Sequence, residues 1–183
     1  PPQMLSPVVG DWPTYIPTGD DLRLAPDPCP YRQRGGRAAG LDILASFLNQ
    51  RGRDYRYQMS SPVTAFDASS RLSPHLTWGT ISMREVAQAS WTRMRALKLS
   101  NAPDSSRWRA SLRSFTGRQH WHCHFMQKLE DEPRLEFENL HHAYDGLRPA
   151  VADSERLSAW SEGATGFPFI DACMRALNQH GWI

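Results

Sequence analysis

Residues 105–133 read SSRWRASLRSFTGRQHWHCHFMQKLEDEP and hold the longest periodic pattern in the chain. Within this stretch, the steps alternate between four and three residues along Trp108, Leu112, Phe115, Gln119, His122, Met126 and Leu129. That spacing is typical of one face of an α-helix, and Pro133 marks its end. We therefore expect one long helix with a buried stripe whose polar members lie at its middle.

Shorter helical patterns flank this segment on both sides. The sequence predicts helices over residues 37–50, after the capping residue Ser82, between the capping residue Asp153 and Trp160, and again after a turn over residues 163–168. No alternating strand pattern of useful length occurs in the sequence. The expected fold class is therefore all-α.

Composition points to a globular domain with a real core. The chain has 183 residues, 40% of them hydrophobic, and a net charge of +2. Its three cysteines are far apart in the sequence, and no apolar run approaches the roughly 20 residues that a membrane span needs. We expect a soluble, cytoplasmic protein without a membrane segment.

Proline usage divides the chain into two parts. Eight of the 14 prolines fall in the first thirty residues, where they leave few backbone N–H groups for helix or sheet. Residues 1–34 are therefore predicted to be an interdomain connector, and residues 35–183 to be a helical domain. The connector also carries apolar side chains, so we expect it to lie against a folded surface; these are Met4, Leu5, Trp12, Tyr15 and Ile16.

Basic side chains concentrate between residues 93 and 118, where Asp104 is the one acid. The basic residues are Arg93, Arg95, Lys98, Arg107, Arg109, Arg113 and Arg118. Such a stretch could neutralise the phosphates of a nucleic acid or a cofactor. It could equally be two solvated helix faces, and charge alone leaves both interpretations open.

A histidine-rich segment follows. On a helix, His120 and His124 share a face with Cys123, which permits zinc binding. No carboxylate or further cysteine completes the set nearby, so a packing or hydrogen-bonding role is favoured and no metal site is predicted. The sequence also lacks the Gly-x-Ser-x-Gly elbow of serine hydrolases and the Gly-x-Gly-x-x-Gly fingerprint of dinucleotide-binding folds.

Three motifs stand in order along the chain. The first is Tyr57 followed by SSRLS at residues 69–73; the second is SFTGRQHWHCHF at 114–125; the third is WSEGATGFPFIDACMR at 160–175 with Gly-Trp at 181–182. Together they resemble the FAD-binding helical domain of the DNA photolyase and cryptochrome family over residues 35–183, departing from it at Phe169. Residues 127–133 and 144–148 are similar to a bacterial photolyase-related branch.

The resemblance implies a role for individual residues. The phosphates and ribityl chain of FAD would be held by Tyr57, Ser69, Ser70, Arg71, Leu72 and Ser73, with Trp182 packed near the flavin. Trp121 would be the catalytic residue that lines the lesion cavity, with Arg118 and His122 beside it. For Asp171 and Arg175, four residues apart, the spacing predicts an ion pair within one helix.

The resemblance also implies an activity, that of a blue-light-dependent FAD flavoprotein of the photolyase type. As a lyase, it would repair UV photolesions in DNA, acting as a monomer. DNA-repair members carry a Glu one helical turn before the Trp, where this chain has Arg118, so a cryptochrome-type photoreceptor without repair activity remains the alternative. A helical nucleic-acid-binding module without flavin is a third hypothesis.

The resemblance further implies that the chain is the first part of a larger FAD domain. We expect a second, antenna chromophore in a domain N-terminal to it. We also expect the 183 residues alone to be inactive and to bind FAD weakly or not at all.

Overall fold

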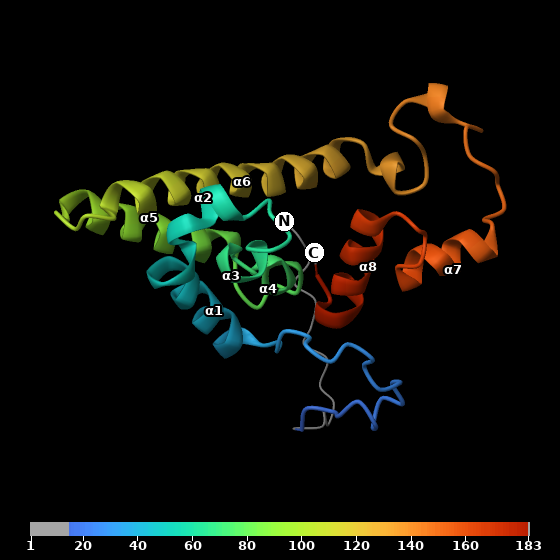
Figure 1. The fold of residues 1–183 in the computed structure, drawn as a ribbon, viewed down its shortest axis with the longest axis horizontal. Coiled ribbons are helices and arrows are strands. Elements are labelled where there is room, and N and C mark those ends of the chain that lie inside the picture. Colours follow the sequence, from blue (N-terminus) through green and yellow to red (C-terminus); the bar gives the residue numbers. More distant parts are fainter. Residues whose placement is uncertain (1–14, 183) are drawn as a thin grey trace, which may run out of the picture.

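The computed structural model describes residues 15–182, and every regular element in that range is helical (Figure 1). The expected all-α class is confirmed. In chain order, the α-helices and 3-10 helices (η) are α1 (Arg37–Asn49), η1 (Arg51–Asp54), α2 (Tyr55–Gln58), α3 (Ala65–Ala68), α4 (Ser73–Thr77), α5 (Met83–Leu99), α6 (Ser105–Asp131), η2 (Pro133–Glu136), η3 (His142–Tyr144), α7 (Ser154–Glu162) and α8 (Pro168–His180).

Local side-chain chemistry sets the helix ends where the sequence predicted them. The Ser82 hydroxyl accepts a hydrogen bond from the Glu85 backbone N–H, and the Glu85 carboxylate accepts one from the Ser82 N–H, so a capping box starts α5. Asp153 accepts the first free N–H groups of α7. Gly163 ends α7 in the left-handed conformation that glycine adopts without strain.

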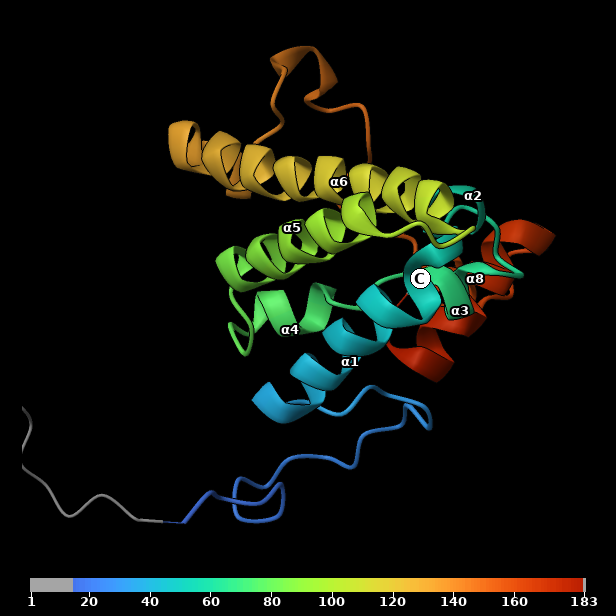
Figure 2. The same ribbon diagram turned by 90° about the vertical axis from the view of Figure 1, so that its left-hand side faces the viewer.

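The core lies where α5 and the first half of α6 run side by side in opposite directions (Figure 2). From α1 and α2, Phe47 and Tyr55 meet Phe115 of α6 with ring centroids 4.7–5.7 Å apart. Leu112 of α6 and Val86 of α5 are fully buried beside them. Apolar side chains of four helices therefore close one cluster.

The long helix α6 is buried along only half of its predicted stripe. Trp108, Leu112, Phe115 and Gln119 are buried, but Met126 is 62% exposed and His122 is also exposed. The prediction of a continuous buried stripe to Leu129 is therefore wrong. The physical reason is that α5 and α2 pack against the first part of α6, while Figure 1 shows its second half extending past them.

The connector contacts the C-terminal end of the helical domain. The Cys29 thiol and the Tyr31 N–H both donate to the carbonyl of Gln179 at 3.0 Å, and that carbonyl belongs to the last turn of α8, where carbonyl oxygens lack helical partners. Tyr15 and Ile16 are exposed, so the expectation that they lie against a folded surface is wrong. Met4, Leu5 and Trp12 lie outside the described residues.

Two further findings concern the described range as a whole. None of the helices between residues 15 and 182 combines the length and apolar character that crossing a bilayer requires. Cys29, Cys123 and Cys173 are free thiols, of which Cys29 is buried and Cys123 exposed.

Candidate cofactor and DNA site

The SSRLS segment forms a sharp loop between α3 and α4. Arg71 adopts a φ of +58°, a left-handed conformation that side chains other than glycine rarely take. Leu72, which follows it, is 1% exposed and packs in the core. The Leu72 side chain is thus an anchor for the loop, and only its backbone could face a ligand.

Arg51 holds this loop in place from beneath. Its guanidinium donates to the carbonyl of Ser69 at 2.6 Å and to that of Ser70 at 3.4 Å, and it also donates to the Ser46 hydroxyl at 3.0 Å. Burial and the nearby Arg71 lower the Arg51 pKa. Sequence reasoning missed this residue, because an arginine beside a short polar turn gives no signal of its own.

The Arg71 side chain connects the loop to the C-terminal end of α8. It donates through Nε to the Phe66 carbonyl at 2.9 Å, and its guanidinium carbon lies 4.0 Å from the centroid of the Phe66 ring. The Trp182 ring stacks on Phe66 with centroids 5.7 Å apart, and the same guanidinium lies 5.8 Å from Trp182. Burial lowers the Arg71 pKa. Two of the predicted cofactor residues, Arg71 and Trp182, are therefore brought together.

A small cavity of about 190 Å³ lies between the loop and α6. Ser69 and Ser70 line it from one side, and Arg118 lines it from α6. The Ser69 hydroxyl is buried without a hydrogen-bond partner in the described part of the chain. Two predicted cofactor residues and one predicted DNA-facing residue thus line one cavity.

Tyr55, rather than Tyr57, is the tyrosine that lines this cavity. Tyr55 is 6% exposed, and burial raises its pKa. Tyr57 is 58% exposed and lies instead under the guanidinium of Arg107, whose carbon is 4.7 Å from the ring centroid. Ser73 is also separated from the other loop serines, since it lines a different cavity together with Trp182.

The second half of α6 presents an open aromatic face. Trp121 is 60% exposed, and its ring lies 5.9 Å from that of Phe125 and 5.8 Å from that of His124. His122, also predicted to face DNA, is exposed on the same helix. Among residues 15–182, no three His, Cys, Asp or Glu side chains gather closely enough to hold a metal ion.

Part of the basic stretch is used inside the fold. Arg93 donates to the Leu48 carbonyl at 3.0 Å and lies 5.2 Å from the Trp108 ring centroid, while Arg107 pairs with Asp54. These contacts fasten α5 and α6 to the preceding helices. Arg93 and Arg107 in the basic stretch therefore stabilise helix packing, and a ligand would have to bind the other basic side chains.

The third motif builds the junction between α7 and α8. Asp171 accepts hydrogen bonds from the Thr165 N–H at 2.8 Å, the Thr165 hydroxyl at 2.6 Å and the Gly166 N–H at 3.0 Å, and these bonds lower its pKa. Arg175 donates instead to the Gly163 carbonyl at 3.0 Å. The predicted Asp171–Arg175 ion pair is therefore wrong: the free N–H groups of the turn are nearer partners for the carboxylate.

Comparisons with known proteins agree with this arrangement. The family described as the FAD binding domain of DNA photolyase matches residues 115–183. A deoxyribodipyrimidine photo-lyase from Streptomyces griseus is 31% identical over 172 residues, covering 87% of this chain and 33% of the relative. A deoxyribodipyrimidine photo-lyase from Halobacterium salinarum is 34% identical over 148 residues, covering 81% of this chain and 29% of the relative.

A solved structure is also similar. The crystal structure of a bacterial class III photolyase from Agrobacterium tumefaciens superposes with a TM-score of 0.66 at 29% identity, covering 81% of this chain and 28% of that one. This chain belongs to the DNA photolyase and cryptochrome family. It spans about a third of the length of the curated relatives it matches.

The lining of the cavity between the loop and α6 fits the diphosphate of the photolyase cofactor. The cavity is lined by Arg118 and by a serine hydroxyl that has no hydrogen-bond partner within residues 15–182, and no carboxylate is among its lining residues. Hydroxyl and guanidinium donors suit an anionic bridge. At about 190 Å³ the cavity is smaller than sites for whole cofactors, so it fits one group of FAD rather than all of it.

Proposed function

We propose that this chain is part of a blue-light-dependent FAD flavoprotein of the photolyase type that repairs UV photolesions in DNA. The observation that carries the proposal is the shared cavity, in which the loop serines meet Arg118 of the helix that also bears Trp121. A cofactor held by the loop would therefore lie on the same side of α6 as Arg118. The photolyase names of the relatives support a lyase activity.

Each residue then has a physical task. Ser69 and Ser70 donate to the cofactor diphosphate, and Arg118, which lines the same cavity, places positive charge next to it. FAD, when bound, supplies the light-driven electron. The exposed ring of Trp121 offers a stacking surface for a base extruded from the duplex, with Arg118 and His122 as donors to the DNA.

A cryptochrome-type photoreceptor is the second candidate. The position one helical turn before Trp121 carries Arg118, where DNA-repair members have a Glu. In the structure this guanidinium lines the cavity of the loop serines. A cation beside a bound diphosphate stabilises the cofactor without contributing the acid that contacts damaged bases.

The proposal extends to the setting of the protein. We propose a cytoplasmic, monomeric protein that acts on photolesion-containing DNA. Its three free thiols support a reducing compartment. A second, antenna chromophore would be bound by a domain N-terminal to this chain. Because the cavity fits only one group of FAD, the isolated 183 residues should retain the cofactor weakly or not at all.

The experiment uses the full-length protein. Its blue absorption after purification measures bound flavin, and illumination with a UV-damaged oligonucleotide measures repair. Trp121→Ala should weaken damaged-DNA binding about tenfold at unchanged flavin content, since stacking on one aromatic ring is worth about 1–3 kcal/mol per base. Trp91→Ala, which removes a comparably exposed ring on α5, is the matched control.

The possible results separate the candidates. Light-dependent repair establishes a photolyase. Flavin photochemistry without repair favours the photoreceptor. Full-length protein that carries no flavin refutes both and leaves the nucleic-acid-binding module.

A further inference from the structure

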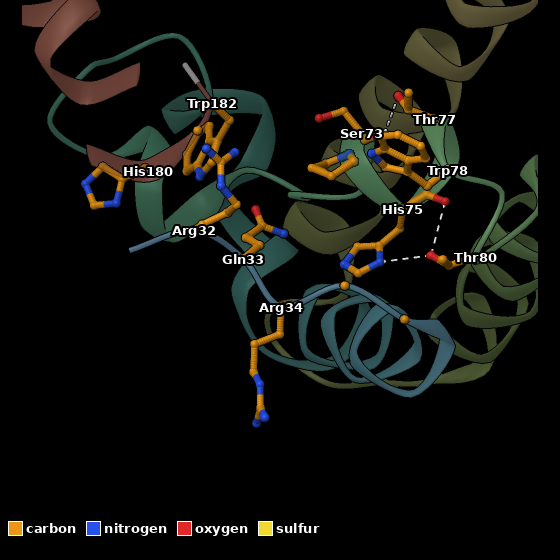
Figure 3. A pocket seen from close by; sticks show the side chains of 14 residues that line it. Arg32, Gln33, Arg34, Ser73, His75, Thr77, Trp78, Thr80, His180 and Trp182 are labelled. Atoms are coloured by element: carbon orange, nitrogen blue, oxygen red, sulfur yellow. Dashed lines mark hydrogen bonds between the residues drawn. The ribbon is translucent and has the colours of Figure 1, made fainter. Parts of the chain in front are cut away.

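The connector reaches the SSRLS loop through one side chain, that of Gln33. This residue is half-buried, and its Nε2 donates a hydrogen bond to the backbone carbonyl of Arg71 at 3.0 Å, across 38 residues of sequence. In Figure 3 the side chains of Gln33 and the exposed Arg34 leave the connector in different directions at the edge of a cavity of about 590 Å³. The connector therefore contacts the predicted FAD-binding loop directly.

The carbonyl that Gln33 holds belongs to the one residue of the loop with a left-handed backbone. Arg71 has a φ of +58°, which is unfavourable for a residue with a Cβ atom and persists only where the surroundings impose it. Within residues 15–182, Gln33 is the only group that donates to this carbonyl outside regular helical bonds. Arg51 holds the two preceding carbonyls, so Arg71 depends on a separate contact.

The backbone of Arg71 sets the position of the loop serines. On one side of it, Leu72 is 1% exposed and anchored in the core. On the other side, Ser69 and Ser70 line the cavity assigned to the FAD diphosphate. Because Leu72 is fixed, a change of φ at Arg71 would move the chain on the serine side. The conformation of Arg71 therefore controls where the serine hydroxyls point.

The connector is itself fixed next to Gln33. The Cys29 thiol and the Tyr31 N–H both donate to the Gln179 carbonyl at 3.0 Å. The Tyr31 ring also stacks on the ring of His180, with centroids 5.4 Å apart. Gln33 thus extends from a backbone that is attached to the end of α8 only two residues earlier. Its amide is held in place before it meets the loop.

We propose that Gln33 is a positioning residue for the cofactor loop. Its amide keeps the Arg71 backbone in the left-handed conformation and so keeps Ser69 and Ser70 in place for the FAD diphosphate. The inference rests on the proposed function and extends it, because a connector residue outside the predicted cofactor set then contributes to cofactor retention. When only a fraction of the molecules has the binding conformation, the apparent affinity falls by that fraction.

The experiment measures the FAD Kd of the full-length protein, from the fluorescence of released flavin in a dilution series. Gln33→Ala and Gln33→Met should each raise the Kd about fivefold, the factor that corresponds to one hydrogen bond. Gln33→Met keeps the length of the side chain but cannot donate. Gln88→Ala removes the same side chain from an exposed position on α5 and should leave the Kd unchanged.

A second pair of measurements separates positioning from general stabilisation. Light-driven reduction per bound flavin should be unchanged in both Gln33 variants, because Gln33 acts on retention and not on the flavin ring. A substitution that only lowered overall stability would shift the urea midpoint and leave the FAD Kd of the folded protein unchanged. Circular dichroism checks that each variant is folded.

Two results would overturn the inference alone. One is a Gln33→Met protein that binds FAD as tightly as the wild type, since the amide donor would then be dispensable. The other is an equal rise of the Kd in Gln88→Ala. A full-length wild-type protein without flavin is a different outcome, which would overturn the proposed function and this inference together.

Discussion

Removing the Arg51 guanidinium tests how the cofactor loop is held. Arg51→Ala removes four hydrogen bonds, two to loop carbonyls and two to α1. The two shortest are 2.6 Å to the Ser69 carbonyl and 3.0 Å to the Ser46 hydroxyl. Hydrogen bonds to charged groups contribute about 1.5–3 kcal/mol each. Counting only the short pair, and discounting because Arg51 is half-buried and water can replace it, we expect a loss of about 2–3 kcal/mol.

Urea unfolding of the full-length protein measures this loss. With a slope near 2 kcal/mol per molar, the midpoint should fall by about 1–1.5 M. Arg53→Ala is the matched control, because the exposed Arg53 side chain makes only ion pairs with Asp54 and Asp104, and Asp54 keeps its second partner Arg107; such pairs contribute about 0–1 kcal/mol. Arg51→Ala should also retain less flavin than Arg53→Ala. Equal midpoints for the two variants would show that Arg51 does not hold the loop.

Three further predictions concern the scaffold. Gly163→Ala should destabilise by about 1–2 kcal/mol or more, because φ is +69° and the new Cβ would lie 2.7 Å from the Asp171 carbonyl oxygen; an unchanged melting temperature would contradict this. For Glu85, the ion pair with Arg37 and the hydrogen bonds from Ser82 lower the pKa to about 2. The stability that Glu85 contributes is therefore present above about pH 4.5 and is lost as the pH falls towards 2. Glu85→Gln should flatten that part of the urea midpoint profile, and parallel profiles would refute the reasoning. Leu112→Ala, at a fully buried position, should lower the free energy of unfolding by about 2–5 kcal/mol, whereas Leu99→Ala, 86% exposed, should change it by less than about 0.5 kcal/mol; similar losses would overturn the burial assignment.

Helix positions were largely readable from the sequence, because the signals that set them are local. Ser82 with Glu85, and Asp153 before α7, cap helices with atoms only two or three residues away. Burial was less readable. The α6 pattern continues at helical spacing past Gln119, yet Met126 is exposed, since periodicity gives the face of a helix but not the length over which a neighbour covers it.

The sequence predicted which motif forms the site but not how its residues are arranged in space. The resemblance pointed to residues 69–73, but their serines divide between two cavities, with Ser69 and Ser70 in one and Ser73 in the other. The support from Arg51 crosses 18 residues of sequence to reach Ser69. No pattern in the chain records such a contact.

The sequence by itself determined the all-helical class, the helix caps and the family motifs, because periodicity, capping and residue identity are properties of neighbouring residues. Only the tertiary structure decided which guanidinium groups surround the loop, that Tyr55 rather than Tyr57 lines its cavity, and that Asp171 binds a turn instead of Arg175. These outcomes depend on distances between segments far apart in the chain. Such distances are set by the packing of the shared core, where each side chain takes its place only after the helices have met.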